Sequence, residues 1–583
     1  MPSAVVSLLA AAAAAAAGAS AASCDGVFDY TPRNLIPLME NNGTDKLFPM
    51  GDCFGFKLEE ATIDEMHDAM VKGDLTSVQL VTCYMTRTFQ TQPYINSLMQ
   101  MNPDALAIAA QRDKERADDP ERINARPLHG IPFTVKENIG TLDNMETTAG
   151  SLALLGSRVP NDAFVVKGLR NAGAVLFGKA TLSEWADMRS NNYSEGYSGR
   201  GGQCRSAYNL NVNPGGSSSG SGVGVGANCI AFSVGTETDG SVINPAMRNS
   251  IVGLKPTVGL TSRAGVIPET EHQDSVGTFG RTVRDAVYVL DAIYGMDCND
   301  NYTSAQVGKT PKTNYADSLT TKDALKDATF GLPWNSFWKY ADAEQLETLT
   351  ALIKLIEEQG ATIINNTEIT DYETIVPPDG WNWDHGTARN RPNESEYTYI
   401  KSDFYRNINT YLSKLKNTDI RTLEDIMQYN LDNDGSEGGN PWPLGNPAWY
   451  SGQDGFQASV ETKGVQDEEY WQALNFCQST SRRGIDDALH YQNKTLSGLL
   501  VPPAVGQSYQ LSAQAGYPVI TVPAGIHSES GMGFGLAILQ TAWAEEELVK
   551  WGSAIEDLTK GTKFARTLPK WNGYLQRILP VPM

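Results

Sequence analysis

The side chains best placed for chemistry lie between residues 130 and 256, where two serine-bearing glycine segments follow a lysine. The first segment, Pro214–Gly222, carries four serine hydroxyls. Such composition is typical of a flexible linker, but apolar segments flank it on both sides. A phosphate-binding loop is excluded because G-x-x-x-x-G-K-[ST] needs a lysine that this run lacks.

A nucleophile elbow, G-x-S-x-G, is literally satisfied by Gly216–Gly220 and would make Ser218 the nucleophile. That site would also need an acid and then a histidine downstream. Among the six histidines, His490 and His527 fit by chain order alone. This interpretation stays open, but it leaves the rest of the region unexplained.

The second segment is the glycine-bearing turn 235–241, which follows the apolar, strand-like run 230–234 and ends at Ser241. Such a turn presents its hydroxyl and aligns successive backbone N–H groups into a nest that can hold an oxyanion. Upstream, Lys136 stands at the end of the strand-like run 131–135. A lone lysine is usually an ordinary surface residue, but a neutral lysine beside a serine can be a general base.

Together these segments resemble the amidase signature family. The family pairs a lysine in G-x-P-x-x-[VI]-K-[DE]-N with a G-G-S-S-[GS]-G run and a G-T-[DE]-x-[DG]-G-S turn. Residues 130–138, 215–220 and 235–241 match these motifs in order and spacing. The resemblance extends over about residues 58–575 and is weakest across 310–480. Further matching segments are 147–151, 178–185, 252–257, 281–285 and 515–525.

The turn Glu237–Ser241 looks like that of the peptide amidase and plant or fungal amidase branch. The fatty-acid-amide and amidotransferase branches carry an aspartate and two glycines there. They also place an arginine two residues after the nucleophile, where this chain has Ile243. These departures argue against a role on fatty-acid amides or on glutaminyl-tRNA.

The resemblance implies a Ser-Ser-Lys triad, with no metal ion and no organic cofactor. Ser241 would be the acylated nucleophile, and Ser217, held in a cis peptide bond in the family, would bridge it to Lys136. Lys136 would accept the Ser241 proton through Ser217 and later return it to the leaving amine. The oxyanion would be held by backbone N–H groups of Thr238, Asp239, Gly240 and Ser241.

This chemistry requires a neutral Lys136, so its pKa must fall from about 10.4 toward ~7–8. Burial among apolar strands lowers a lysine pKa. Glu137 would oppose that shift if it faced the same way, but alternation along a strand points neighbours to opposite faces. We therefore expect Lys136 to be buried and Glu137 to point away from it.

The implied function is hydrolysis of a small-molecule or peptide carboxamide to an acid and ammonia, or an amine, through an acyl-enzyme. An esterase or carbamate hydrolase on the same triad is one alternative, and a non-catalytic binding relative is another. The complete set of Lys136, Ser217 and Ser241 argues against the latter. The acyl group stays open because the variable region supplies the pocket. Candidate lining residues there are Trp381, Trp383, Trp442 and Trp449.

The elements that must position these residues alternate between helix and buried strand, which predicts an α/β fold. Capping boxes begin helices at Thr62 and Thr76. Further helices are expected at 104–117, 162–172, 343–359 and 459–482, with strands at 131–135, 174–177, 229–235 and 517–522. We expect one large domain, 58–583, whose central twisted mixed sheet is flanked by helices. Its catalytic core is 125–290, and a variable insertion, 310–480, forms the substrate-side wall.

The N-terminus predicts secretion. Residues 1–22 hold no charged side chain and run through poly-alanine to an A-x-A-like site, the pattern of a signal peptide. An N-terminal arm, 23–57, follows. Glycan acceptor sequons begin at Asn42, Asn192, Asn301, Asn365, Asn393 and Asn493. Among seven cysteines without a C-x-x-C motif, we predict pairing of Cys24 with Cys53 and a core position for Cys83.

The composition of the 583-residue chain is that of a globular protein, with 41% hydrophobic and 20% charged residues. It excludes a disordered chain, a coiled coil and a collagen-like fibre. The net charge of −22, without a basic run, argues against nucleic acid and anionic membrane surfaces as partners.

Overall fold

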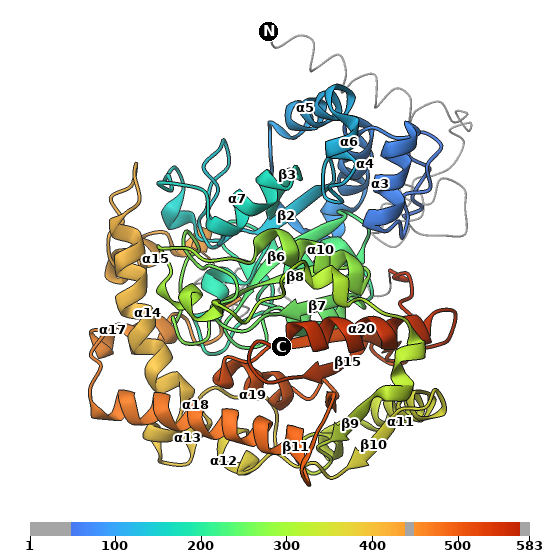
Figure 1. The fold of residues 1–583 in the computed structure, drawn as a ribbon. Coiled ribbons are helices and arrows are strands. Elements are labelled where there is room, and N and C mark those ends of the chain that lie inside the picture. The colour runs from blue at the N-terminus through green and yellow to red at the C-terminus, as the bar shows by residue number, and fades with distance from the viewer. Residues whose placement is uncertain (1–47, 438–447, 572–583) are drawn as a thin grey trace, which may run out of the picture. The chain divides into compact units, whose positions relative to one another are not determined.

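An 11-stranded mixed sheet runs through the chain from Met50 onward (Figure 1). The computed structural model describes residues 48–437 and 448–571. The expected signal peptide, most of the N-terminal arm, Cys24, Asn42 and Trp442 lie outside the described residues. In spatial order the strands are β1 (Leu98–Met101), β3 (Val175–Ala180), β2 (Pro132–Lys136), β6 (Phe232–Glu237), β8 (Ser275–Gly280), β7 (Val252–Lys255), β14 (Val519–Ile526), β15 (Gly533–Leu539), β13 (Gly498–Val501), β9 (Thr329–Leu332) and β10 (Thr362–Asn365).

The site-bearing part of this sheet is parallel. Strand β2 lies between β3 and β6 and pairs parallel with both, whereas β8 runs antiparallel to β6. Phe133 and Phe232 stack across β2 and β6 with ring centroids 5.4 Å apart. Every residue of β2, β3 and β6 is buried, as expected for parallel strands covered on both faces.

Helices cover both faces of the sheet. Neighbouring residues of a strand point to opposite faces of the sheet. On one face, Ile520 of β14 contacts Gly552 of α20. On the other face, Thr521 of β14 and Gly535 of β15 lie beside Met247 of α9. Helices α10 and α20 pack together, α10 against β8 and α20 against β14; α10, α20 and β8 are labelled in Figure 1. The helices are α3 (Ile63–Lys72), α4 (Ser77–Ile95), α5 (Ala105–Asp118), α6 (Pro120–Ile123), α7 (Phe164–Asn171), α8 (Ser219–Gly226), α9 (Ile243–Arg248), α10 (Val283–Ile293), α11 (Ala343–Glu358), α12 (Tyr372–Ile375), α13 (His385–Ala388), α14 (Glu396–Ser413), α15 (Leu423–Asp432), α16 (Asp434–Glu437), α17 (Asp454–Thr462), α18 (Glu468–Leu489), α19 (Gln507–Ala515) and α20 (Glu545–Thr559).

Local sequence signals place several of these elements correctly. Thr62 and Thr76 form reciprocal capping boxes with Glu65 and Gln79 at the starts of α3 and α4. The strand predicted at 131–135 is β2, shifted by one residue, so Lys136 is its last residue. The predicted α/β fold, with its mixed sheet between helices, is confirmed.

The region 310–480 differs in part from the wall that we expect from the sequence. Its strands β9 and β10 join the main sheet and pair parallel with each other, and β9 also pairs with β13. Helix α14 of the same region packs against α17 and α18 (Figure 1). Because β9 and β13 are far apart in the chain, no local pattern could predict their pairing.

The predicted Cys24–Cys53 pair is wrong. Cys83, which we expect in the core, is partly buried against the core and is not a free thiol. Cys53 forms a disulfide with Cys83 of α4, whose Cα lies 5.8 Å away. The partner was missed because the segment before α3 folds back onto α4, which sequence spacing does not show. Cys204, Cys229, Cys298 and Cys477 are free thiols.

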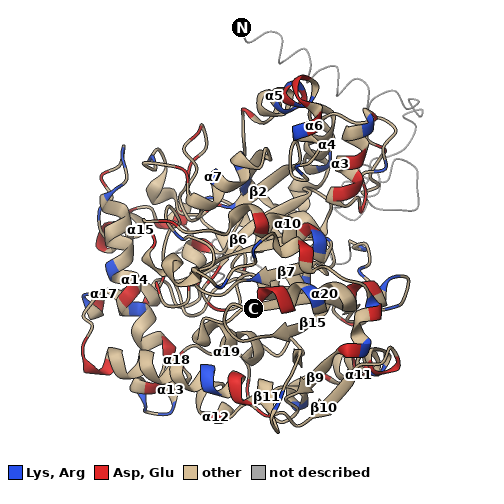
Figure 2. Cartoon of the chain, viewed as in Figure 1, with Lys and Arg blue, Asp and Glu red and all other residues tan. Residues whose placement is uncertain are grey.

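The outer surface is mixed in charge. Figure 2 shows acidic and basic residues interspersed on α3, α5 and α20. Within the described part of the chain, no helix is both long enough and apolar enough to cross a membrane.

Candidate active site

A hydrogen-bonded chain of three side chains joins the ends of β2, β6 and the glycine-serine segment. Lys136 Nζ lies 2.7 Å from Ser217 Oγ, and Ser217 Oγ lies 2.8 Å from Ser241 Oγ. The peptide bond between Gly216 and Ser217 is cis. The structure therefore brings together the lysine and both serines of the predicted triad.

Lys136 Nζ also donates to Thr236 Oγ1 at 2.9 Å and to the Thr236 carbonyl oxygen at 3.2 Å. With the bond to Ser217, these make three donated hydrogen bonds, as an ammonium group makes them. After loss of one proton, the amine keeps two N–H donors for Thr236 and has a lone pair that can accept the Ser217 proton. Asn138 Nδ2 also donates to Thr236 Oγ1, at 3.0 Å, and so fixes that hydroxyl. Thr236 and Asn138 are positioning residues that the motif alone did not reveal.

Burial lowers the pKa of Lys136 to about 8. The nearby carboxyl groups of Glu269, Asp187 and Glu195 partly oppose this shift because they favour the ammonium form. Glu137 does not contribute, since its carboxylate accepts from Thr148 and Arg200 instead, the latter at 2.7 Å. The expectation that Glu137 points away from Lys136 is confirmed.

The nucleophile turn is held by Glu237, the last residue of β6. Its Oε2 accepts the backbone N–H groups of Val242 at 2.7 Å and Ile243 at 3.0 Å. Gly240 has a φ of +83°, and a Cβ there would lie 2.5 Å from the Tyr509 ring. Only glycine meets both demands, so the turn can bend tightly beneath Ser241.

A pocket of about 60 Å³ opens above Ser241. This volume can accommodate a small group such as a carboxamide. Thr238, Asp239 and Gly240 line it beside the nucleophile; their oxyanion role remains a prediction. The other lining residues are Ala186, Asp187, Tyr193, Glu195, Gly216, Asn244, Glu269, Trp381, Trp383 and Tyr509.

The pocket wall is acidic and aromatic. Among its described lining residues are four carboxyl groups and no lysine, arginine or histidine. Trp381 and Trp383 line it, as proposed from the sequence. Trp449 does not, because its ring lies against the Arg189 guanidinium, 3.5 Å from the ring centroid.

One stretch of the wall has unusual backbone geometry. Trp185, Ala186 and Asp187 have φ values of 52°, 52° and 85°, in the left-handed region that non-glycine residues rarely adopt. Such conformations persist where the surroundings enforce them, often at binding sites. Nothing in the residue types of this stretch predicts the conformation.

The alternative nucleophile, Ser218, has no base beside it. Its hydroxyl donates to the carbonyl of Thr236 at 3.0 Å. His490 lies against the carbonyl of Asp486, and His527 lies near Asp342 and Glu344. The geometry therefore gives no support to the nucleophile-elbow interpretation.

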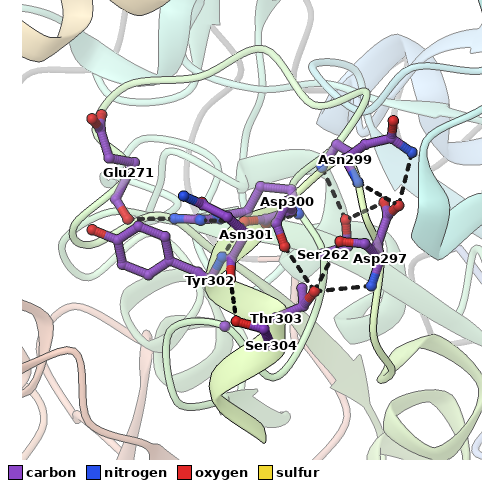
Figure 3. A network of polar contacts seen from close by, with 12 residues as sticks. Ser262, Glu271, Asp297, Asn299, Asp300, Asn301, Tyr302, Thr303 and Ser304 are labelled. Carbon is purple, nitrogen blue, oxygen red and sulfur yellow. Dashed lines mark hydrogen bonds and ion pairs between the residues drawn. The ribbon is translucent and has the colours of Figure 1, made fainter.

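A larger cavity of about 450 Å³ lies beside the loop that carries η3 (Asn301–Gln306), and the polar groups of that loop form hydrogen bonds within the loop and with the adjoining segment 262–263. Asp300 accepts from Arg263 Nε at 2.8 Å. Asp297 accepts from Ser262 at 2.8 Å (Figure 3). Thr303 donates to the Asp300 carbonyl at 2.7 Å in the same network. This network stabilises the loop and offers no nucleophile.

Glu271, His272 and Asp403 bring metal-ligand types of atom within 4.8 Å of one another. His272 is already engaged at both ring nitrogens, by the hydroxyls of Tyr302 at 2.6 Å and Tyr470 at 3.0 Å. Arginine, asparagine, threonine and tyrosine donors likewise engage the two carboxylates. We therefore interpret this group as a hydrogen-bonded cluster that stabilises the fold.

Comparison with known proteins shows the family to which the chain belongs. The family model described as Amidase matches residues 79–433. A putative amidase from Schizosaccharomyces pombe is 54% identical over 550 residues, which cover 93% of this chain and 92% of the relative. A probable amidase from Arabidopsis thaliana is 38% identical over 513 residues, 86% of this chain and 91% of the relative. The native peptide amidase from Stenotrophomonas maltophilia superposes with a TM-score of 0.75 at 34% identity, covering 88% of this chain and 98% of that one.

Fold and relatives together define an α/β enzyme that hydrolyses amides. The chain belongs to the amidase signature family, with fungal and plant amidases among its relatives and peptide amidase among its structural neighbours. The family membership inferred from three short motifs is confirmed.

Proposed function

We propose that this enzyme cleaves carboxamides through an acyl-enzyme on Ser241, with Lys136 as the base. The observation that carries the proposal is the continuous relay of 2.7 and 2.8 Å from Lys136 through Ser217 to Ser241. The relay ends at a buried amine whose pKa is lowered to about 8, so the amine can accept a proton near neutral pH.

In the first step, Ser241 Oγ attacks the amide carbon while its proton passes to Ser217 and the Ser217 proton passes to Lys136. Backbone N–H groups of the turn 238–241 stabilise the oxyanion. The protons then return along the relay to the leaving nitrogen, which departs as ammonia or an amine. Water repeats the sequence on the ester and releases the acid.

The pocket favours neutral amide substrates. Its described lining residues include four carboxyl groups and no basic side chain, so no cation is present among them to bind a substrate carboxylate close to the reacting carbon. The acid product likewise finds no cationic partner there, which assists its release. A primary carboxamide, such as the C-terminal amide of a peptide, fits the charge and the small volume. The similarity to peptide amidase supports this substrate class.

A substrate panel tests the proposal. Purified enzyme is offered peptide amides, aryl and alkyl amides, and the matching esters and carbamates, and the released acid and ammonia are measured. We expect amide turnover that Ser241→Ala abolishes. Turnover of esters or carbamates alone would show that the triad serves another hydrolase, and no turnover by a folded protein would favour a binding relative.

We also propose that the protein is secreted and glycosylated. The disulfide Cys53–Cys83 fits an oxidising compartment. Within the described residues, the sequon asparagines are exposed: Asn192, Asn301, Asn365, Asn393 and Asn493. We expect protein in the medium that lacks its first ~22 residues and loses mass on glycosidase treatment. An unglycosylated cytosolic chain of full length would contradict this.

A further inference from the structure

Glu396 is a buried acid that the triad does not explain. It begins α14, and only 1% of it is exposed. Its Oε1 accepts from Gln510 Nε2 at 2.6 Å and from Gln514 Nε2 at 3.1 Å, and its Oε2 accepts from Gln273 Nε2 at 3.0 Å. Amides from α19 and from the loop before β8 thus converge on one carboxyl group.

The glutamine amides have a fixed orientation, because the amide oxygens accept from other donors; that of Gln510 accepts the backbone N–H of Asn382 at 3.5 Å. Tyr399 donates to Gln273 Oε1, and Ser481 donates to Gln514 Oε1 at 3.2 Å. Their NH₂ groups must therefore face Glu396, which accepts from all of them. A carboxyl group that only accepts hydrogen bonds is favoured in its ionised form.

Asp239, two residues before Ser241, is the remaining partner of Glu396. Glu396 raises the pKa of Asp239, because two neighbouring buried carboxyl groups resist ionising together. Trp381 Nε1 donates to Asp239 Oδ2 at 2.6 Å, whereas the buried Oδ1 has no hydrogen-bond donor among the described residues. More donors serve Glu396 than Asp239, which favours the negative charge on Glu396 and the proton on Asp239.

We propose that Asp239 acts as a neutral carboxylic acid that donates to Glu396, and that Glu396 is a positioning residue of the nucleophile turn. This inference rests on the proposed acylation of Ser241. The benefit is electrostatic: an ionised Asp239 would place negative charge beside the oxyanion that the turn must stabilise. Glu396 keeps that charge farther along the network, where three amides share it.

The surroundings support this protonation state. Burial and the neighbouring Glu396 and Glu237 raise the pKa of Asp239 well above its ordinary value. Burial raises the pKa of Glu396 to about 7, against the lowering effect of its glutamine donors. The other titratable groups that face the pair are Lys255, Tyr399, Cys477 and Tyr509. Lys255 donates to the carbonyls of Pro256 and Tyr517 rather than to either carboxyl group.

Charge rescue tests the proposal. Glu396→Gln removes the negative partner, so Asp239 ionises beside Ser241, and we expect kcat to fall about tenfold to a hundredfold. Adding Asp239→Asn to that variant removes the new charge and should restore most of the loss. The matched control is Glu556→Gln, a buried glutamate of α20 whose pKa is also raised to about 7 but which contacts the Val283 N–H instead.

A merely structural role of Glu396 predicts the opposite pattern, because a second substitution in the same network would lower activity further. A double variant no better than Glu396→Gln therefore overturns the proposal. Active sites are counted with a fluorophosphonate probe in every variant. An unlabelled, inactive parent would instead contradict the proposed function itself.

An infrared difference spectrum keeps the proposal testable if Glu396→Gln does not fold. Subtracting the spectrum of Asp239→Asn from that of the parent at neutral pH should show the C=O band of one protonated carboxylic acid. Loss of a pair of carboxylate bands would show that Asp239 is ionised, and the proposal would be wrong.

Discussion

Lys136 and Lys179 lie near the ends of neighbouring parallel strands and differ in what they can do. Both are fully buried, and burial lowers the pKa of each to about 8. Lys179 pairs in register with Val135, so the two lysines point to opposite faces of the sheet. Lys136 meets a serine hydroxyl, whereas Lys179 donates to the Ile139 carbonyl and to Thr147 Oγ1.

The comparison shows that a depressed pKa does not by itself make a general base. Lys255 is a third example: its pKa is also lowered to about 8, yet its contacts are the carbonyls of Pro256 and Tyr517. What distinguishes Lys136 is a partner that can hand over a proton and that in turn contacts the nucleophile. The hydrogen-bond partners therefore decide which buried lysine can act as a general base, and burial only lowers the pKa.

The largest expected effect is that of Lys136→Ala. Without the base, neither serine can lose its proton, so kcat/KM for amides should fall about 10³- to 10⁴-fold. Activated esters should be affected less, because their leaving groups need no proton. Steady-state kinetics on a matched amide and ester pair measures the difference. An equal loss of kcat/KM on the amide and on the ester would contradict the role of Lys136 in protonating the leaving group.

Lys179→Met should affect stability rather than chemistry. It leaves the Ile139 carbonyl unpaired and removes a cation near the buried Glu137, so we expect the free energy of unfolding to drop by about 3 kcal/mol. Denaturant unfolding measures this loss. The kcat of the remaining folded enzyme should stay near that of the parent. A loss of kcat as large as that of Lys136→Ala would contradict the comparison.

The pH dependence sharpens the same contrast. Lys136 is inactive as a base while protonated, so kcat/KM should rise through its pKa of about 8 and level off on the alkaline side. The same rise of kcat/KM with pH should remain in Lys179→Met, because Lys179 does not take part in proton transfer. A histidine base would give full activity by about pH 7.5 instead.

The smallest effects are expected for His490→Ala and His527→Ala. Both side chains contact groups outside the nucleophile pocket, so activity should stay within a few-fold of the parent. If a folded histidine variant were inactive while Lys136→Ala were active, the nucleophile-elbow interpretation would return.

The sequence could predict what lies in short contiguous motifs. Lys136, Ser217 and Ser241 each lie in a local pattern, and Lys136 and Ser241 come at the end of or shortly after apolar strands. Glu396 could not be found in this way, because its glutamine partners lie 114 to 123 residues away in the chain. The Cys53–Cys83 bond and the β9–β13 pairing were missed for the same reason: long-range packing decides them.

The most direct test of the account is to map the residue that a fluorophosphonate probe modifies. Peptide mass spectrometry should find the adduct on Ser241 in the parent and in Lys179→Met, slower labelling in Lys136→Ala, and none in folded Ser241→Ala. An adduct on Ser218, or labelling that persists in Ser241→Ala, would contradict the assignment of the nucleophile and with it the role of Lys136.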